Sequence, residues 1–174
     1  MPDVVVVGAG VIGASVAWHL ARQGLRALVL EREASPGQGS TGRATGGFRA
    51  QYGTAINVRL SLLAREKLRR FEEETGVDPG YAPNGTSGWR APRRSWAGLY
   101  EMSPDQHAVL GRAPECGNLF LCNGNSGNGV THAPALGQLL AEIIVHGKGR
   151  SLDVHELRPS WFAEGEPNPA PRLL

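Results

Sequence analysis

The glycine spacing G-x-G-x-x-G near the start of this 174-residue chain limits its fold more than any other feature. In a turn that joins a strand to a helix, the first glycine permits a tight bend and the second lets a pyrophosphate approach the backbone. The third lets the helix pack closely on the strand. The sequence therefore predicts a dinucleotide site at the amino end of a helix. The residues of this turn are Gly8, Ala9, Gly10, Val11, Ile12 and Gly13.

A β-α-β unit is predicted around the turn. Residues 3–7 are a β-branched run, residues 11–22 carry apolar side chains at helical spacing, and residues 27–30 form a second apolar run. Both runs are typical of strands buried on both faces, and the crossover makes them parallel. Glu31 ends the second run, where an acid accepts hydrogen bonds from ribose hydroxyls, and Arg32 follows it in the predicted site. Such an acid favours an unphosphorylated ribose, as in NAD or FAD.

The rest of the chain alternates helical and strand patterns around glycine-rich loops. Helices are expected at residues 54–75 and 134–145, and strands at residues 95–102, 107–110 and 118–122. Together with the β-α-β unit they predict a three-layer, Rossmann-like α/β fold with a mainly parallel sheet flanked by helices.

The chain is interpreted as one domain over residues 1–150, followed by a C-terminal tail at residues 151–174. Proline and glycine break every pattern near residues 84–94, which are interpreted as a junction. The three prolines close to the end of the tail lead us to expect poor order there.

The formal net charge of +2 gives no basis for a nucleic-acid partner or for binding to an anionic membrane. No stretch reaches the roughly 20 apolar residues of a membrane helix, and the apolar start lacks the basic flank of a signal peptide. We therefore expect a cytoplasmic protein without a nucleic-acid or membrane partner.

Neither cysteines nor histidines predict a metal site. Cys116 and Cys122 fit no metal or redox spacing and are interpreted as free buried thiols. The five histidines do not cluster at metal-binding spacing. His19 is interpreted as a packed or surface residue, and His132, near a glycine-rich loop, has a functional alternative to packing. The catalytic residues stay unknown at this level.

Three separated blocks resemble a known family. Residues 30–33 with 39–47 form the first block, residues 96–105 the second, and residues 119–129 with 133–137 the third. In this order they are similar to the D-amino-acid-oxidase superfamily, which includes sarcosine oxidase, glycine oxidase and dimethylglycine dehydrogenase. The resemblance implies FAD as the cofactor.

The resemblance also implies which residues would bind the flavin. The segment after the second strand would wrap the pyrophosphate and ribityl chain, and its two glycines would pass near the isoalloxazine ring. A late glycine loop and the helix after it would direct N–H groups at the N1–O2 edge of the ring, which stabilises reduced flavin. The residues of the first segment are Ser40, Thr41, Arg43, Ala44, Thr45, Gly46 and Gly47. Those of the second are Gly124, Asn125, Ser126, Gly127, Asn128, Gly129, Val130 and Thr131.

The chain departs from the family pattern in several places. Family members carry a substrate domain where this chain has only the junction. Asn128 replaces a usual histidine, Asn125 a usual aromatic residue, and Gln106 stands where histidine is common. Gly98 replaces the cysteine that tethers the flavin in some members, so FAD is expected to bind noncovalently. We interpret the sequence as a trimmed, engineered chain, with a natural short paralogue or splice form as the alternative.

The functional hypothesis is a minimal FAD-binding module derived from an amine or amino-acid oxidoreductase, with little or no amine oxidation. One alternative is an active FAD-dependent oxidase or dehydrogenase of small amines or amino acids. Another is an NAD-binding domain without catalysis. Removal of a domain exposes apolar surface, so self-association is also expected.

Overall fold

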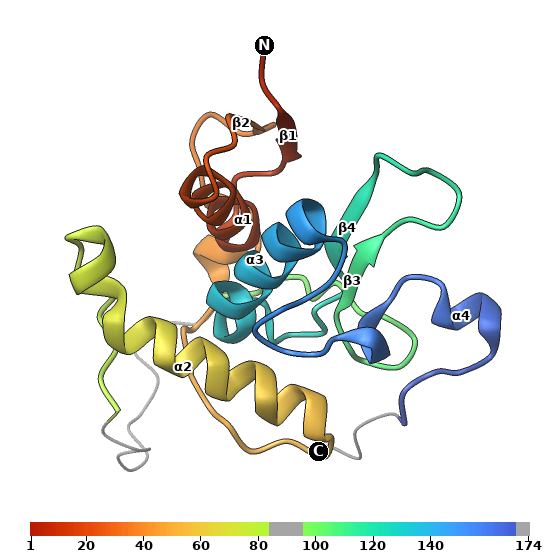
Figure 1. Cartoon of the computed structure of the whole chain (residues 1–174). Helices are drawn as coiled ribbons and strands as arrows, with labels where there is room; N and C mark the ends of the chain where they lie inside the picture. Colours follow the sequence, from red (N-terminus) through yellow and green to blue (C-terminus); the bar gives the residue numbers. More distant parts are fainter. Residues whose placement is uncertain (84–95, 170–174) are drawn as a thin grey trace.

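The computed structural model describes residues 1–83 and 96–169, so the predicted junction at residues 84–94 lies outside the described residues. The α/β fold class is confirmed (Figure 1). The strands form two separate two-stranded sheets, one parallel and one antiparallel, and not one continuous layer. Helix α3 lies between α1 and α2 and contacts both. In chain order the elements are β1 (Val4–Val7), α1 (Val11–Arg22), β2 (Ala27–Leu30), η1 (Thr41–Arg43), α2 (Ala55–Thr75), β3 (Val109–Arg112), β4 (Phe120–Asn123), α3 (Gly129–His146), η2 (His155–Leu157) and α4 (Trp161–Glu164).

The β-α-β unit has the predicted helix and strands. β1 pairs with β2 in parallel, with Val4 opposite Ala27 and Val7 opposite Leu30. The expectation that both strands are buried on both faces is wrong, because Val7 is 84% exposed and Leu30 is 48% exposed. Helix α1 packs against both strands. The side chains of Val5 and Val7 on β1 stay open to solvent.

The strands of the second sheet begin later in the sequence than predicted. β3 and β4 are antiparallel, with Leu110 opposite Cys122. β3 begins at Val109, later than expected, because His107 is held in a turn by Asp105: the His107 amide donates to Asp105 Oδ1 at 3.1 Å. The expected strand at residues 95–102 is wrong. Of these residues the structure describes 96–102, and they contain only an isolated bridge between Met102 and Asn125.

Helices α2 and α3 frame the core. α2 begins one residue after the expected start and ends as predicted at Thr75. α3 begins at Gly129, five residues before the expected start, with Pro134 inside its first turns. A proline there removes only one of the early helical hydrogen bonds, and the ladder has already begun where the His132 amide donates to the Asn128 carbonyl at 2.9 Å.

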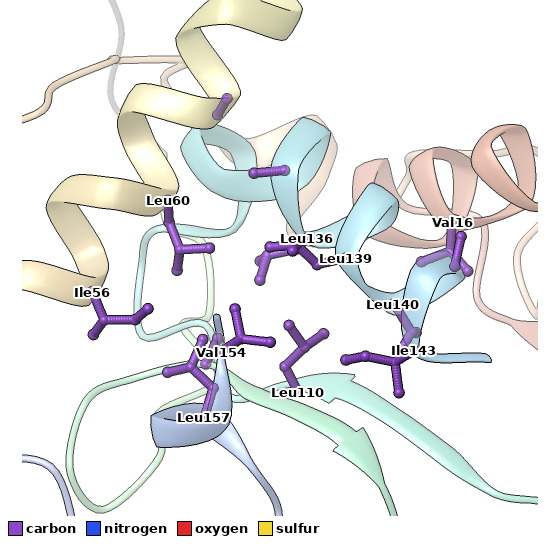
Figure 2. Close-up of a cluster of buried hydrophobic side chains, with 14 of the residues drawn as sticks. Val16, Ile56, Leu60, Leu110, Leu136, Leu139, Leu140, Ile143, Val154 and Leu157 are labelled. Atoms are coloured by element: carbon purple, nitrogen blue, oxygen red, sulfur yellow. The ribbon is translucent and has the colours of Figure 1, made fainter. Parts of the chain in front are cut away.

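The core gathers around α3 (Figure 2). Leu136 and Leu139 of α3 face Leu60 of α2, and Leu140 lies near Val16 of α1. Helices α1 and α3 approach so closely that a methyl group added at Gly137 would lie 2.1 Å from the Ser15 Oγ atom. This contact positions the amino ends of both helices relative to one another.

The segment after residue 150 packs onto the same core. Val154 and Leu157 belong to the central cluster, and Trp161 is fully buried. The described part of the tail thus contributes side chains to the core, and the boundary at residue 150 stays a prediction. The expected poor order concerns an end of which residues 170–174 lie outside the described part.

Candidate functional site

A groove of about 1630 Å³ collects most of the predicted site residues. Its walls are the glycine turn, the segment after β2, the loop that precedes α3, and the strands β1 and β4. Ligand pockets usually measure about 300–1,000 Å³, so this groove has room for a large extended ligand. The predicted residues that line it are Gly8, Gly10, Val11, Ile12, Gly13, Glu31, Arg32, Ser40, Thr41, Arg43, Ala44, Thr45, Gly46, Gly47, Asn125, Gly127, Gly129, Val130 and Thr131.

The glycine turn joins β1 to α1 as predicted. A methyl group at Gly13 would lie 1.9 Å from the carbonyl oxygen of Gly8, so only glycine lets the helix pack this closely on the turn. A methyl group at Gly10 would lie 3.0 Å from the Thr41 hydroxyl and would narrow the groove at the amino end of the helix. The first turn of α1 itself carries no acidic side chain that would repel an anion.

Glu31 holds the turn from the end of β2. Its Oε2 atom accepts a hydrogen bond from the Ala9 amide at 2.7 Å, and its Oε1 atom accepts from the amides of Arg32 and Glu33 at 2.8 and 3.0 Å. The hydrogen bonds from the Glu33 and Ala9 amides lower the pKa of this carboxyl group. An ionised carboxylate offers about four acceptor sites, so at least one remains for a ligand hydroxyl.

The segment after β2 closes over the glycine turn. The Thr41 hydroxyl accepts a hydrogen bond from the Val11 amide at 3.0 Å, which ties this segment to the start of α1. At its other end, the Gly47 carbonyl accepts a hydrogen bond from the Thr131 hydroxyl at 3.2 Å. The two predicted flavin segments, far apart in the sequence, are therefore joined in space.

The loop before α3 is held by its own contacts. The four predicted residues that do not line the groove are Ala9, Gly124, Ser126 and Asn128. The Ser126 hydroxyl donates to the Gly124 carbonyl at 3.0 Å, and Asn128 Oδ1 accepts from the Tyr52 hydroxyl at 3.2 Å. The Ala9 amide likewise bonds Glu31. These residues therefore use their polar groups to hold the wall of the groove in place and do not face its interior.

Trp96 and residues 98–101, predicted as part of a strand, instead line the groove. The Trp96 indole donates to the Arg43 carbonyl at 2.9 Å, and the Ser40 hydroxyl donates to the Leu99 carbonyl at 3.0 Å. The Tyr100 ring lies against Gly127, where an added methyl group would come within 2.8 Å of it. Sequence reasoning missed these lining residues, although their block belongs to the family resemblance.

Two histidines are buried against α2 and the residue before it. His132 Nε2 lies 2.9 Å from the Ser61 hydroxyl, and His107 Nε2 lies 2.9 Å from the Thr54 hydroxyl. Burial lowers the pKa of His132 to about 4, so this imidazole is neutral at pH 7. The burial of His132 and its contact with Ser61 indicate a packing role and not the functional alternative.

The cysteines were the other candidates for nucleophilic or metal chemistry. Cys116 is exposed, so its expected burial is wrong, while Cys122 is partly buried and both are free. Burial raises the pKa of the Cys122 thiol to about 12, which makes it a poor nucleophile. Within residues 1–83 and 96–169, no group of three His, Cys, Asp or Glu side chains is arranged to hold a metal ion.

A membrane-spanning helix needs about 20 mostly apolar residues. None of the described helices combines the length and hydropathy needed to cross a membrane. The cytoplasmic location stays a prediction.

A family model matches most of the chain. The model of the family described as FAD dependent oxidoreductase (DAO) matches residues 3–89 and 87–143. These two segments meet inside the stretch that the sequence marks as a junction. They include the glycine turn, the segment after β2 and the loop before α3.

Curated relatives match over a smaller part. FAD-dependent oxidoreductase domain-containing protein 1 is 40% identical over 76 residues in Xenopus laevis and 45% identical over 80 residues in Bos taurus. Each match covers 43% of this chain and spans only 15% and 16% of the respective relative. Mitochondrial dimethylglycine dehydrogenase of Mus musculus is 35% identical over 85 residues, which are 48% of this chain and 10% of that protein.

A solved structure has the same fold. L-proline dehydrogenase from P. horikoshii superimposes with a TM-score of 0.81 at 16% sequence identity, over 96% of this chain and 99% of that chain. At this low identity the likeness shows the fold alone.

Proposed function

Because the chain belongs to the family of FAD-dependent oxidoreductases, we propose that it is a minimal FAD-binding module that holds FAD noncovalently and oxidises amines little or not at all. FAD is the cofactor of this family, which favours it over NAD. The observation that carries the proposal is the single groove into which three separated segments converge.

The residues of the groove fit FAD. The amino end of α1, left clear by Gly10, would receive the pyrophosphate, and Glu31 would accept hydrogen bonds from the adenosine ribose. Arg43 has a planar fork suited to a phosphate oxygen. Gly98 lies against Arg43 and offers no sulfur for a covalent link, which supports noncovalent binding.

The predicted ring end of the groove lies at the loop before α3. Gly127, Gly129 and Val130 line this end, where the first N–H groups of α3 carry the positive end of the helix dipole. Such donors would stabilise negative charge on a reduced ring. When bound, FAD supplies the electron acceptor for oxidation of an amine.

The proposal of weak turnover rests on what surrounds this end. Leu99 and Tyr100 are 80% and 72% exposed, so solvent reaches the wall that they form. An acidic side chain also lies at the loop before α3, because Glu101 Oε1 accepts a hydrogen bond from Asn125 Nδ2 at 2.7 Å. A carboxylate repels the carboxylate of an amino-acid substrate, and water weakens electrostatic stabilisation of the reaction.

A steady-state assay tests the proposed lack of turnover. FAD-loaded protein is mixed with sarcosine, proline or glycine, and reduction of an artificial electron acceptor is followed. We expect rates at the level of free FAD. Turnover at rates typical of enzymes, about 1–10³ per second, would favour the alternative of an active oxidase or dehydrogenase. Acid precipitation of the same sample should leave the flavin in the supernatant, since a yellow pellet would contradict noncovalent binding.

A further inference from the structure

A second cavity, of about 880 Å³, lies at the carboxyl end of α3. It is lined by the end of this helix and the loop that follows it, by β3, and by residues 153–155 and 158–160. Its volume falls within the range of about 300–1,000 Å³ that is common for ligand sites. None of the predicted cofactor-binding residues lines it.

The loop on one side of this cavity is fixed in place. Glu142, buried in α3, accepts hydrogen bonds from the amides of Arg150 and Ser151 through Oε2, at 2.6 and 2.9 Å. A methyl group added at Gly149 would lie 2.5 Å from the Leu152 carbonyl oxygen, so the loop requires glycine there. A buried carboxylate and a tight glycine contact therefore hold the backbone that presents Lys148 and Arg150.

The charge in the cavity is positive. Arg112, Lys148 and Arg150 line it against the single carboxylate of Asp153. A fourth cation, Arg158, already pairs with Glu164 and with Glu166, the latter at 2.8 Å. Because Arg158 faces two carboxylates, this group has a net charge of −1. The carboxyl end of α3 adds about half a negative charge, so Arg112, Lys148 and Arg150 still exceed the opposing negative charge, by about half a unit.

We propose that this cavity binds a phosphate group, either as inorganic phosphate or as a small phosphate monoester. Guanidinium groups donate paired N–H bonds to phosphate oxygens, and an ammonium group adds a point charge. Arg112 also lines the cofactor groove, so the two sites share one wall residue. This inference does not depend on the low turnover proposed above.

Isothermal titration calorimetry tests the site. The protein is first saturated with FAD, so that the phosphate-binding turn at α1 is filled, and is then titrated with inorganic phosphate or with glycerol phosphate. The double variant Lys148→Gln/Arg150→Gln should bind at least about tenfold more weakly than the unchanged protein, since two charge-assisted contacts are lost. Added salt should weaken binding in the unchanged protein.

The matched control is Arg69→Gln/Arg70→Gln, which removes the same charge from the exposed face of α2. Its affinity should stay within about twofold of the unchanged protein. Binding of either titrant with this dependence on Lys148 and Arg150 supports the site and identifies the ligand form. Absence of binding for both titrants, or equal affinity in the double variant, overturns it. Circular dichroism of each variant verifies that the fold is retained.

Discussion

Glu31 shows how one side chain serves both the fold and the proposed site. Its carboxylate fixes the glycine turn through the Ala9 amide and still has an acceptor position free for a ribose hydroxyl. Gly13 has an equally sharp requirement, since it lies directly against the Gly8 carbonyl. The turn follows from its glycines and was predictable from the sequence, whereas the bond from Glu31 to the Ala9 amide was not predicted and the ribose contact stays a prediction.

Gly13→Ala is expected to destabilise the chain. The new methyl group meets backbone and not a movable side chain, so α1 must shift away from the turn, at a cost of about 1–3 kcal/mol or more. Urea unfolding measures this cost, and FAD affinity should fall with it. Gly39→Ala is the control, because an added methyl group at Gly39 meets no atom within 4 Å. Equal stability of the two variants would contradict the packing described.

His132 is expected to make stability depend on pH. Because burial lowers its pKa from 6.5 to about 4, the unfolded chain binds a proton before the folded chain does as the pH falls. Stability from this group is therefore complete above pH 6.5 and is lost between pH 6.5 and 4. The loss reaches at most about 3 kcal/mol.

Urea unfolding at several pH values measures this dependence. His132→Leu should reduce the slope of unfolding free energy against pH in that window, although its stability at pH 7 is also expected to fall. His155→Asn, at an exposed position, should keep the slope of the unchanged protein. An unchanged slope in His132→Leu would show that this group does not titrate as described.

For helices and strands, the sequence predicted correctly those boundaries that a neighbouring residue determines. α1 has the predicted bounds, and α2 ends as predicted, because glycines follow their last turns. The start of α3 was missed because Pro134 was taken as the first helical residue, whereas it lies inside α3 and leaves one helical hydrogen bond unmade. Residues 96–101 have an apolar pattern typical of a strand, yet they lie along the segment after β2, a contact that no local pattern encodes.

Gly137→Ala tests the contact between α1 and α3. The added methyl group would lie 2.1 Å from Ser15 Oγ and 2.6 Å from the Ser15 carbonyl carbon, so the helices must separate. A loss of about 1–3 kcal/mol is expected. Thermal unfolding and FAD titration should both respond, because the two helix ends at the groove move with their helices. Gly117→Ala, where a methyl group meets open space, should leave stability unchanged. An unaltered melting temperature in Gly137→Ala would contradict the close crossing.

For the whole molecule, the exposed face of the parallel sheet is the feature that sequence reasoning described incorrectly. Val5 and Val7 of β1 and Leu28 and Leu30 of β2 are all exposed. Patterns of β-branched residues predict strands, but they do not report which neighbour covers each face. The site was more predictable: its three segments were named from the sequence, whereas their convergence and the wall at Trp96 and residues 98–101 required the fold.

Self-association through this face is expected, since contiguous exposed apolar surface on a sheet promotes contact between copies. Light scattering after size-exclusion chromatography should show a molecular mass that rises with protein concentration. Val5→Thr/Val7→Thr keeps the strand propensity and should shift the equilibrium toward the monomer. Leu62→Thr, on the exposed face of α2, should not. A monomer at all concentrations would contradict this prediction.

Titration with FAD tests the central claim most directly, with protein fluorescence and visible absorbance as readouts and with Glu31→Gln and Glu33→Gln compared with the unchanged protein. We predict that the unchanged chain turns yellow and binds one FAD, and that Glu31→Gln binds about tenfold to a hundredfold more weakly. Glu33→Gln, which also lines the groove but whose carboxylate bonds Arg32 and not the glycine turn, should lose less affinity than Glu31→Gln. A chain that remains colourless in excess FAD, or that loses no affinity when Glu31 is changed, would contradict the account.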